Sequence, residues 1–566
     1  MNPGAVAIAL TAATICLMPA VPAYSKKKPA AGAPFREPLA EDQKTVQALN
    51  RLTFGPRPGD EQHVRAMGLK KWIDLQLHPE WIAENPVLGA KLEPLDSLNM
   101  STARMLESYP SPALVKAMVD GQIPFPDDPE KRRMVQRLVE RYERKANSGK
   151  TEEPTAARLP DLLTAGQLHT FRTGSAQQKL DVLNSLSPDR REQVLDVIPQ
   201  PLRLQLLPLA TPELRRLLQS NAGPQAMVAQ DLVEAKLYRA VYSNRQLQEV
   251  LADFWFNHFN VFLDKGVDHY LVTSYERDVI HPHAFSKFED LLRATAQSPA
   301  MLFYLDNWES AGPAAPAGRR QKRGLNENYG RELLELHTMG VDGGYTQKDV
   351  TEVARCFTGW TIRQPRRVAE FEFNPRMHDD GEKVVLGVRI PAGGGIQDGY
   401  KVLHLLAHHP STAHYISRQL AVRFVADDPP ESLVDRMAAT FLHKDGDLRA
   451  VMKTMLSSPE FWSLGAFRSK VKSPLEMVAS SLRALDADVD FGFGLGNQLT
   501  QLGQPLYRKA EPTGYSNSSQ EWVNSAGLLA RMNYSLALVN NKIPGVKVSA
   551  DQSAAVTLGS PEFQRK

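Results

Sequence analysis

Polar side chains suited to acid–base chemistry occur in three separate segments of the chain, each among apolar neighbours. The first segment is FWFNHFNVF, residues 254–262, in which Asn257, His258 and Asn260 lie within a run of aromatic residues. A helix this aromatic is buried on most sides, so each polar group needs a partner or costs about 1–3 kcal/mol. His258 is therefore either a satisfied core histidine or a proton shuttle in a site, and both interpretations stay open.

The second segment, residues 326–360, is expected to form a helix, a Gly-rich turn and a second helix. Glu332 and Glu335 are three residues apart on the first helix, and His337 follows near its end. Paired carboxylates suit general acid–base work, and Arg331 could clamp an anion. The same groups could instead form an ion-pair network that joins the two helices. Further candidate binding side chains in this segment are Asn326, Asn328, Glu352 and Trp360.

The third segment combines His378 and Asp379 with a Gly-rich stretch at residues 393–399. His378 is a second candidate for the proton shuttle, and Asp379 is a candidate binding carboxylate. The Gly-rich stretch is not a phosphate loop, because no Gly-Lys-Ser/Thr follows it. It is either a substrate-facing loop or a plain connection, with Asp398 as the expected cap of the next helix.

No spacing in these segments matches a tight metal-ligand template, since neither HExxH nor Glu-x-x-His occurs there. His404 and His408 are four residues apart on a predicted helix and are followed by His409. Zinc could bind such a pair, but no third ligand stands at a standard spacing. The sequence therefore leaves the metal and any cofactor unidentified.

Two function classes follow from these patterns. In the first, the three segments meet in one pocket of a hydrolase acting on an envelope or extracellular polymer. His258 or His378 would move the proton, a glutamate would act as acid or base, and Arg331 would bind an anion. In the second, the chain is a non-catalytic scaffold or assembly partner, and the charge-dense helices at 127–235 supply its docking surface.

The elements that must position these residues are helices. Apolar residues recur at helical spacing through most of the chain, whereas strand-like alternation is confined to about 361–391. We expect a mainly α fold, a large multi-helix body with one small β-hairpin in which 367–373 pairs with 383–386. The predicted parts are a signal peptide (1–23), a flexible tether (24–40), an N-terminal helical part (41–126), a variable charged helical insertion (127–235), a core helical domain (236–545) and a loose tail (546–566).

The N-terminal stretch predicts export. Residues 5–21 are apolar and rich in small residues, and Val21-Pro22-Ala23 offers a small-x-small cleavage pattern. A membrane anchor is the alternative, which prolines near the end of the run disfavour. We expect a periplasmic or extracellular protein without a stable membrane span once the signal is removed.

Composition narrows the classes further. Hydrophobic residues make up 42% and charged residues 23%, which excludes wholesale disorder. Lysine and arginine number 67 against 64 acidic residues, and a net charge of +3 does not support nucleic acid as the main partner. Of the two cysteines, Cys16 lies in the predicted signal and Cys356 in a helical pattern, where it is a buried small hydrophobe or, less in keeping with its apolar neighbours, a nucleophile.

Several motifs in order resemble the large bacterial family known only as domain of unknown function 1800. They run from RLTFGPRPGD through FWFNHFNV, NENYGRELLELHTMGVDGGYTQKDVTEVARCFTGW and LAHHPSTAHYISRQLAVRFV to LGQPLYRKAEPTGY. The resemblance covers most of residues 49–536 apart from the insertion. It implies an exported protein and a co-exported sulfatase-like partner, but it carries no activity and no catalytic residues.

Overall fold

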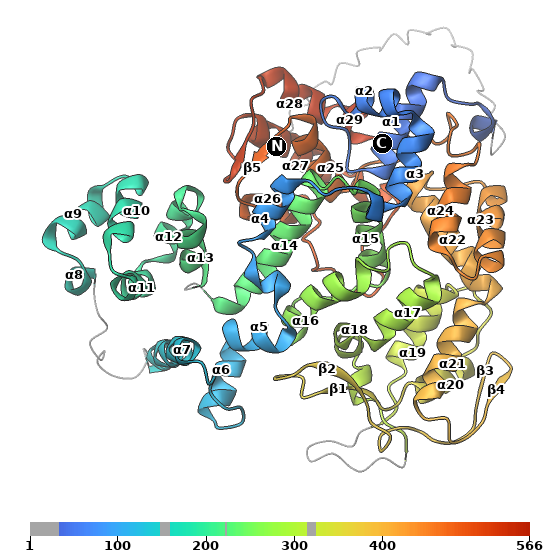
Figure 1. The fold of residues 1–566 in the computed structure, drawn as a ribbon, viewed down its shortest axis with the longest axis horizontal. Helices are drawn as coiled ribbons and strands as arrows, with labels where there is room; N and C mark the ends of the chain where they lie inside the picture. Colours follow the sequence, from blue (N-terminus) through green and yellow to red (C-terminus); the bar gives the residue numbers. More distant parts are fainter. Residues whose placement is uncertain (1–32, 148–158, 221–222, 314–323) are drawn as a thin grey trace, which may run out of the picture.

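The protein is mainly helical in a computed structural model that describes residues 33–147, 159–220, 223–313 and 324–566 (Figure 1). The fold agrees with the class expected from the sequence: 61% of the chain is helical, and the sheets are small antiparallel pairs. The predicted signal peptide and most of the predicted tether lie outside the described residues. No described helix is both long enough and apolar enough to cross a membrane.

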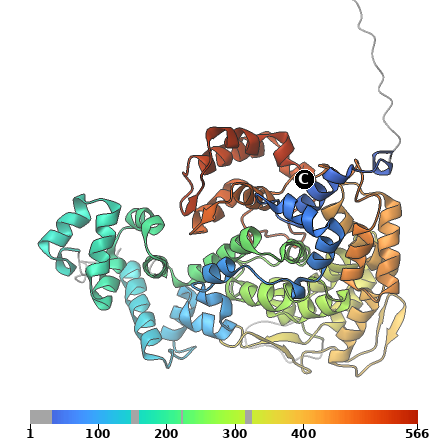
Figure 2. The same ribbon diagram turned by 45° about the horizontal axis from the view of Figure 1, so that its top comes forward.

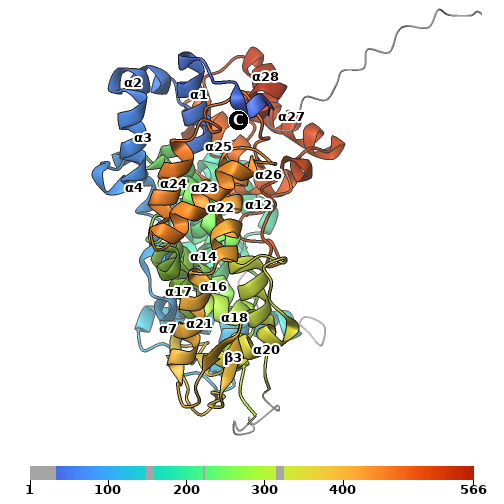
Figure 3. The ribbon, with the colours of Figure 1, turned by 90° about the vertical axis from the view of Figure 1, so that its right-hand side faces the viewer.

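The N-terminal helices pack against the C-terminal part of the chain. Leu39 N–H donates to the Trp462 carbonyl, and the Gln47 side chain donates to the Phe461 carbonyl at 3.2 Å. Figure 3 shows α1–α3 at the same end of the body as α27 and α28, with α20 and α21 at the other end. The helices of this part are α1 (Glu41–Leu52), α2 (Asp60–Met67), α3 (Leu69–Leu77), α4 (Pro86–Leu92), α5 (Thr102–Ser108) and α6 (Pro112–Val119).

The predicted charged insertion holds a separate small core. Leucines and valines spaced along α8–α13 bury one another, among them Leu183, Val194 and Leu206, and Phe491 joins this cluster to the main body. In Figures 1 and 2 this group of helices projects to one side. Its elements are α7 (Pro129–Asn147), α8 (Leu159–Leu162), α9 (Ala165–Thr173), α10 (Ala176–Ser185), α11 (Pro188–Val197), α12 (Gln200–Leu206) and α13 (Pro212–Ser220).

The main core is built around α14 (Pro224–Tyr242). This helix is buried on nearly all sides and packs against α4, α13, α16, α25 and α26. The other helices of the body are α15 (Gln246–His258), α16 (Asp268–Ser274), α17 (Phe288–Gln297), α18 (Pro299–Tyr304), α19 (Asn328–Glu332), α20 (Gln347–Cys356), α21 (Ile396–Ala407), α22 (Pro410–Phe424), α23 (Glu431–His443), α24 (Leu448–Leu456), α25 (Pro474–Ala484), α26 (Phe493–Gln501), α27 (Ser525–Val539), α28 (Gln552–Gly559) and α29 (Pro561–Gln564), with π-helical turns at Tyr275–Ile280 and Leu333–Thr338.

The strand pairing differs from the single hairpin expected. β1 (Trp360–Arg363) pairs with β2 (Glu370–Phe373), and β3 (Lys383–Val385) pairs with β4 (Val388–Ile390). Leu386 and Gly387 both have positive φ between β3 and β4, which is the geometry of a two-residue hairpin turn. Leucine is an unusual residue there, so the sequence did not indicate the turn. A third pair joins β5 (Asp488–Val489) to β6 (Val546–Lys547).

The C-terminal segment is ordered into elements, in contrast to the loose tail expected. After β6, α28 packs against α27, and Asp551 caps α28 by accepting hydrogen bonds from Ser553 and Ala554. Lys566 N–H and the Lys470 carbonyl pair at 2.9 Å. The polar composition of this segment concealed these tertiary contacts, which bring the last residue into the body.

Candidate functional site

Asn257 and Asn260 hold a loop against the end of α15. The Asn257 side-chain amide donates to the Tyr515 carbonyl at 2.7 Å, and the Tyr515 N–H donates to Asn257 Oδ1 at 2.7 Å. Asn260 Nδ2 donates to the carbonyls of Lys509 and Glu511, each at 3.0 Å. These bonds satisfy amide groups placed among aromatic rings, so both asparagines position the loop that follows α26.

His258 and His337 lie side by side. The Nε2–H of His258 donates to the His337 backbone carbonyl at 3.1 Å, and the ring centroids are 6.4 Å apart. Burial lowers the pKa of His258 to about 4. Burial and the nearby His258 lower the pKa of His337 to about 3. Both rings are therefore neutral near pH 7, where neither holds the extra proton that a general acid would donate.

Among the predicted acid–base residues, Glu332 has an environment suited to an acid. Burial and the neighbouring Glu335 raise the pKa of Glu332. Arg331, the predicted anion-binding residue, already has partners: its guanidinium lies 3.7 Å from Glu335 and donates to Gln347 Oε1 at 2.9 Å. The Arg331 pair is half-exposed, and such pairs contribute little to stability.

Glu352 and Asp379 are joined through Arg355. Arg355 Nη1 lies 2.9 Å from Glu352 Oε1, and Arg355 Nε lies 2.8 Å from Asp379 Oδ2. Burial alone would raise the pKa of Asp379, but the Arg355 hydrogen bonds outweigh it and lower that pKa. The two predicted binding carboxylates thus form an ion-pair clamp between α20 and the segment before β3.

His378 belongs to a buried network with Asp398 and Lys383. Its Nδ1–H donates to the Thr358 carbonyl at 2.8 Å, and its Nε2 lies 3.3 Å from Asp398 Oδ2. Lys383 Nζ lies 2.7 Å from the same oxygen, and the Lys383 and Asp398 side chains are both 0% exposed. Asp398 is thus a core ion-pair partner, and Gly395 rather than Asp398, the expected cap, stands at the N-cap of α21. Among the described residues, no contact joins His378 to His258 or Glu332.

The remaining predicted residues also have structural partners. Asn326 Nδ2 donates to the Leu305 carbonyl at 3.1 Å, and Asn326 Oδ1 accepts from the Asn328 N–H at 2.9 Å. Trp360 is fully buried in the core. The structure thus distributes the predicted site over separate groups, and only Asn257 and Asn260 line the central pocket.

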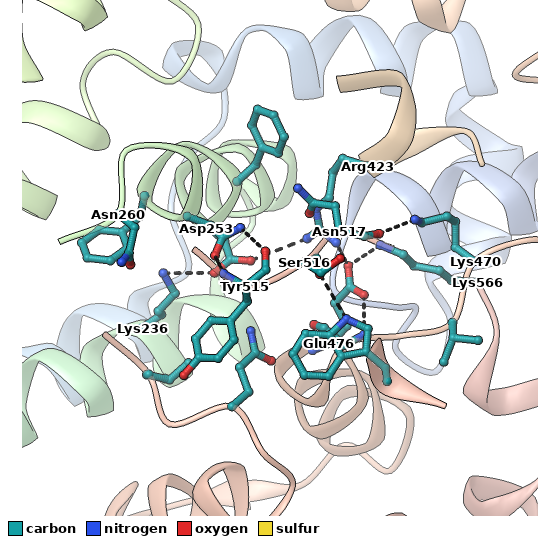
Figure 4. A pocket seen from close by; sticks show the side chains of 18 of the residues that line it. Lys236, Asp253, Asn260, Arg423, Lys470, Glu476, Tyr515, Ser516, Asn517 and Lys566 are labelled. Carbon is teal, nitrogen blue, oxygen red and sulfur yellow. Dashed lines mark hydrogen bonds and ion pairs between the residues drawn. The ribbon is translucent and has the colours of Figure 1, made fainter. Parts of the chain in front are cut away.

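The central pocket lies where α14, α15, α22 and α25 meet the loop that follows α26 (Figure 4). Its enclosed space is about 50 Å³, which is room for a few waters. Four cations and two carboxylates line it: Lys236, Arg423, Lys470, Lys566, Asp253 and Glu476. They come from segments as far apart as α14 and the C-terminal residue.

Asp253 lies between two of these cations. Its Oδ1 is 3.1 Å from Lys236 Nζ, and its Oδ2 is 3.6 Å from Arg423 Nη2. Arg423 is 6% exposed, and its Nη2 has no hydrogen-bond partner among the described residues. A buried guanidinium N–H without a hydrogen bond lowers the stability of the fold. This edge of Arg423 is therefore suited to donate a hydrogen bond to a bound anion.

Glu476 is the second carboxylate and sits at the start of α25. Ser473 and Glu476 form a capping box, in which the Ser473 N–H donates to Glu476 Oε2 at 2.9 Å. The other oxygen, Oε1, contacts both Arg423 and Lys566. Burial would raise the pKa of Glu476, but Arg423 and Lys566 outweigh it and hold that pKa far below its usual range.

Two cations of the pocket also pair with carboxylates outside its lining. Lys236 Nζ lies 3.8 Å from Glu276 Oε1. Lys470 pairs with Asp427 and donates to the Asn517 carbonyl, yet burial still lowers the pKa of Lys470. Burial and the nearby Arg423 lower the pKa of Lys566 well below its ordinary value. Lys472 does not line the pocket but follows Lys470 by two residues, and burial lowers its pKa to about 7. Each cation of the lining thus has a carboxylate partner, and Lys470 and Lys566 lie where water solvates their charge poorly.

Sequence reasoning missed Lys236, Asp253, Arg423, Lys470, Glu476 and Lys566. They lie on five segments, and no spacing along the chain relates them. One local signal was present: SPLE at 473–476 is a capping box and places Glu476 at a helix start. Burial of that carboxylate depends on α22 and the C-terminal residue, which no local pattern reveals.

Two groups of described side chains have the chemistry of metal ligands, and neither lies in the pocket. They are Glu289 with His404 and His408, and His414 with Glu431 and Asp435.

Comparison with curated proteins and with solved structures gave no match. A family described as "Protein of unknown function (DUF1800)" matches residues 47–565, which is nearly the whole chain and includes the central pocket except Lys566. This match confirms the resemblance seen in the motifs and extends it across the charged insertion. The chain therefore belongs to the DUF1800 family.

Proposed function

We propose that the central pocket binds an anionic group of a ligand, a phosphate, sulfate or carboxylate. The observation that carries this proposal is the buried Arg423 guanidinium, which lines the pocket with three lysines and whose Nη2 makes no hydrogen bond among the described residues. A buried donor without a hydrogen bond costs free energy, and a bound anion would offset that cost. Arg423 Nη2, without a hydrogen-bond partner among the described residues, is a donor available to it.

The size of the pocket limits what enters it. The enclosed space of about 50 Å³ holds a few waters, so a single tetrahedral or planar oxyanion group would occupy it by displacing them. The rest of a larger ligand would extend out of the pocket past Tyr515 and Trp522, which line it with Ser516 and Asn517. The proposed ligand is thus a molecule with one buried anionic group and an external body.

The loop that covers the pocket is held in place by hydrogen bonds before any ligand binds. Asn257 fixes Tyr515 from one side, and Lys470 holds the Asn517 carbonyl from the other. The Asp427 carboxylate accepts from the Ser519 N–H at 3.1 Å. A loop fixed at three points loses little conformational entropy when a ligand binds.

The hydrolase predicted from the sequence is not part of this proposal. His258 and His337 are neutral near pH 7, and His378 is held by Asp398 and Thr358. Glu332, with its raised pKa, stays a predicted acid. Nothing in the described residues favours the scaffold function.

Export and the sulfatase-like partner remain proposals that rest on the sequence. The apolar stretch at 5–21 followed by Val21-Pro22-Ala23 supports export. Expression of the full chain in a bacterium with an outer membrane, followed by fractionation, tests it. A mature N-terminus at Tyr24 in the periplasm or medium is expected, and an uncleaved cytoplasmic chain would contradict export.

Anion binding is tested by thermal unfolding in increasing inorganic phosphate, with choline chloride matched for ionic strength. Binding to the native state stabilises it by RT ln(1 + [L]/Kd), about 2.7 kcal/mol at a hundredfold excess over Kd. Phosphate should raise the melting temperature beyond the chloride control, and sulfate should act similarly. Equal melting curves in phosphate and chloride would contradict the proposal.

The variant for this test is Arg423→Gln. After the change, Asp253 still pairs with Lys236 and Glu476 still pairs with Lys566, so neither carboxylate is left without a cation. It should fold and lose most of the phosphate response. Arg418→Gln is the matched control: it lies on the same helix, is half-exposed and pairs with Glu431, outside the pocket. Loss of the response in Arg418→Gln but not in Arg423→Gln would place the anion elsewhere.

A further inference from the structure

His404 of α21, His408 directly after that helix and a glutamate of α17 meet at the surface. His404 and His408 are four residues apart, and their ring centroids are 4.3 Å apart. Glu289, in the first turn of α17, lies between them: its Oε2 is 3.1 Å from His404 Nδ1 and 3.9 Å from His408 Nδ1. The helices α17 and α21 pack against each other, which fixes this approach.

The three side chains have the composition of a zinc site. Two histidine nitrogens and one carboxylate oxygen form the three-ligand set of zinc sites that keep a fourth position open. The three ligand atoms lie within 4.8 Å of one another. Tetrahedral ligands at about 2.0–2.1 Å from zinc lie about 3.4 Å apart, so small side-chain rotations complete the site.

A fourth side chain is placed to orient one ligand. His408 Nε2 lies 2.6 Å from Asp445 Oδ1, in the loop between α23 and α24. Metal-binding histidines commonly donate their second ring N–H to a carboxylate, which fixes the ring. His408 Nδ1–H donates to the His404 carbonyl at 2.8 Å, so metal binding would replace that hydrogen bond, whereas Nε2–H keeps its bond to Asp445.

We propose that Glu289, His404 and His408 bind a divalent transition metal ion, zinc in the first instance, with Asp445 as the positioning residue. The His404 side chain is 65% exposed, so the ion is reached from solvent and its fourth ligand is water or a group of a partner molecule. The site is separate from the central pocket, because none of these four residues lines that pocket. Neither site depends on the other.

Two observations distinguish this group from an ordinary surface ion pair. The imidazoles are parts of one helix face at the spacing that lets two rings reach one ion, and the carboxylate comes from a different helix 115 residues away. The second group, His414 with Glu431 and Asp435, has one histidine only and a mostly exposed acidic pair. It serves as the internal competitor in the test.

The test is calorimetric titration of the full chain with zinc chloride after chelator treatment and dialysis. One zinc ion per chain is expected for the unchanged protein. His404→Asn and Glu289→Gln should each weaken zinc binding by at least about tenfold, and Asp445→Asn by about tenfold. His63→Asn, a change at an exposed histidine remote from both groups in sequence, should leave the affinity unchanged.

Circular dichroism checks that each variant is folded before titration. Absence of saturable zinc binding in the unchanged protein would overturn the proposal. So would unchanged affinity in His404→Asn, or loss of binding in His414→Asn alone, which would place the ion at the competitor.

Discussion

The Nε2–H of His258 donates to the backbone carbonyl of His337. The His337 ring lies in the same aromatic surroundings, and its buried Nε2 has no hydrogen-bond partner among the described residues. Phe254 and Trp255 of α15, and Phe259 directly after it, contact the His258 ring. This arrangement keeps both imidazoles neutral, and it makes the fold sensitive to acid.

Lowering the pH should destabilise the protein through His258. Its pKa falls from 6.5 in the unfolded chain to about 4 in the folded one. Between these values the unfolded state binds more protons, so this contribution is present above pH 6.5 and is lost as the pH falls toward 4. From pH 7 to pH 5 the loss is about 2 kcal/mol. Urea unfolding of the wild type and His258→Phe at both pH values measures it; His63→Asn is the control. Equal pH dependence in wild type and His258→Phe would contradict the assignment.

Removing one partner of the buried pair Lys383–Asp398 should strongly lower the free energy of unfolding. Lys383→Met leaves the Asp398 carboxylate buried with only His378 at 3.3 Å, and an uncompensated buried charge costs about 3–5 kcal/mol. The double variant Lys383→Met/Asp398→Leu should recover much of this loss. Lys401→Met, on the exposed face of α21, is the matched control. Urea midpoints give the result, and a loss below about 1 kcal/mol in the single variant would argue that the carboxylate is solvated.

Cys356 should be inert in the folded protein. Burial raises the pKa of its thiol to about 12, so almost no thiolate exists at pH 8. In a Cys16→Ser chain, which leaves Cys356 as the sole thiol, a disulfide reagent should label nothing until denaturant is added. Rapid labelling of the native chain would mean that the helix α20 opens readily, contrary to its buried position.

Glu476 should hold the cations of the central pocket in place. Glu476→Gln removes the carboxylate shared by Arg423 and Lys566, and we expect a loss of about 3–5 kcal/mol. Saturating phosphate should restore more stability to this variant than it adds to wild type, because the variant leaves Arg423 and Lys566 without the carboxylate that they share. Glu431→Gln, exposed on α23, is the control. A phosphate effect no larger than in wild type would count against an anion in the pocket.

The sequence was sufficient for the fold class and for the local pieces, but not for the site. Helical periodicity predicted a mainly α body, and the aromatic run around His258 predicted buried polar groups with partners. The partner of Asn257 is Tyr515, 258 residues later, and no pattern along the chain specifies that contact. The positive charge of the pocket likewise comes from α14, α22 and the C-terminal residue, each ordinary in its own segment.

The proposed zinc ligands were likewise only partly visible in the sequence. The spacing of His404 and His408 was visible in the sequence, whereas the third ligand comes from α17, where Glu289 begins a helix and has no local mark of metal binding. Local spacing reveals ligands that share a helix, and only the packing of α17 on α21 reveals the one that does not.

The most direct test of the anion pocket is diffraction from crystals soaked in sodium tungstate, a tetrahedral oxyanion with a strong anomalous signal. The pocket account predicts an anomalous peak within hydrogen-bonding distance of Arg423 Nη2 and beside Lys236 or Lys470. Peaks only at surface lysines, with water alone in the central pocket, would contradict it.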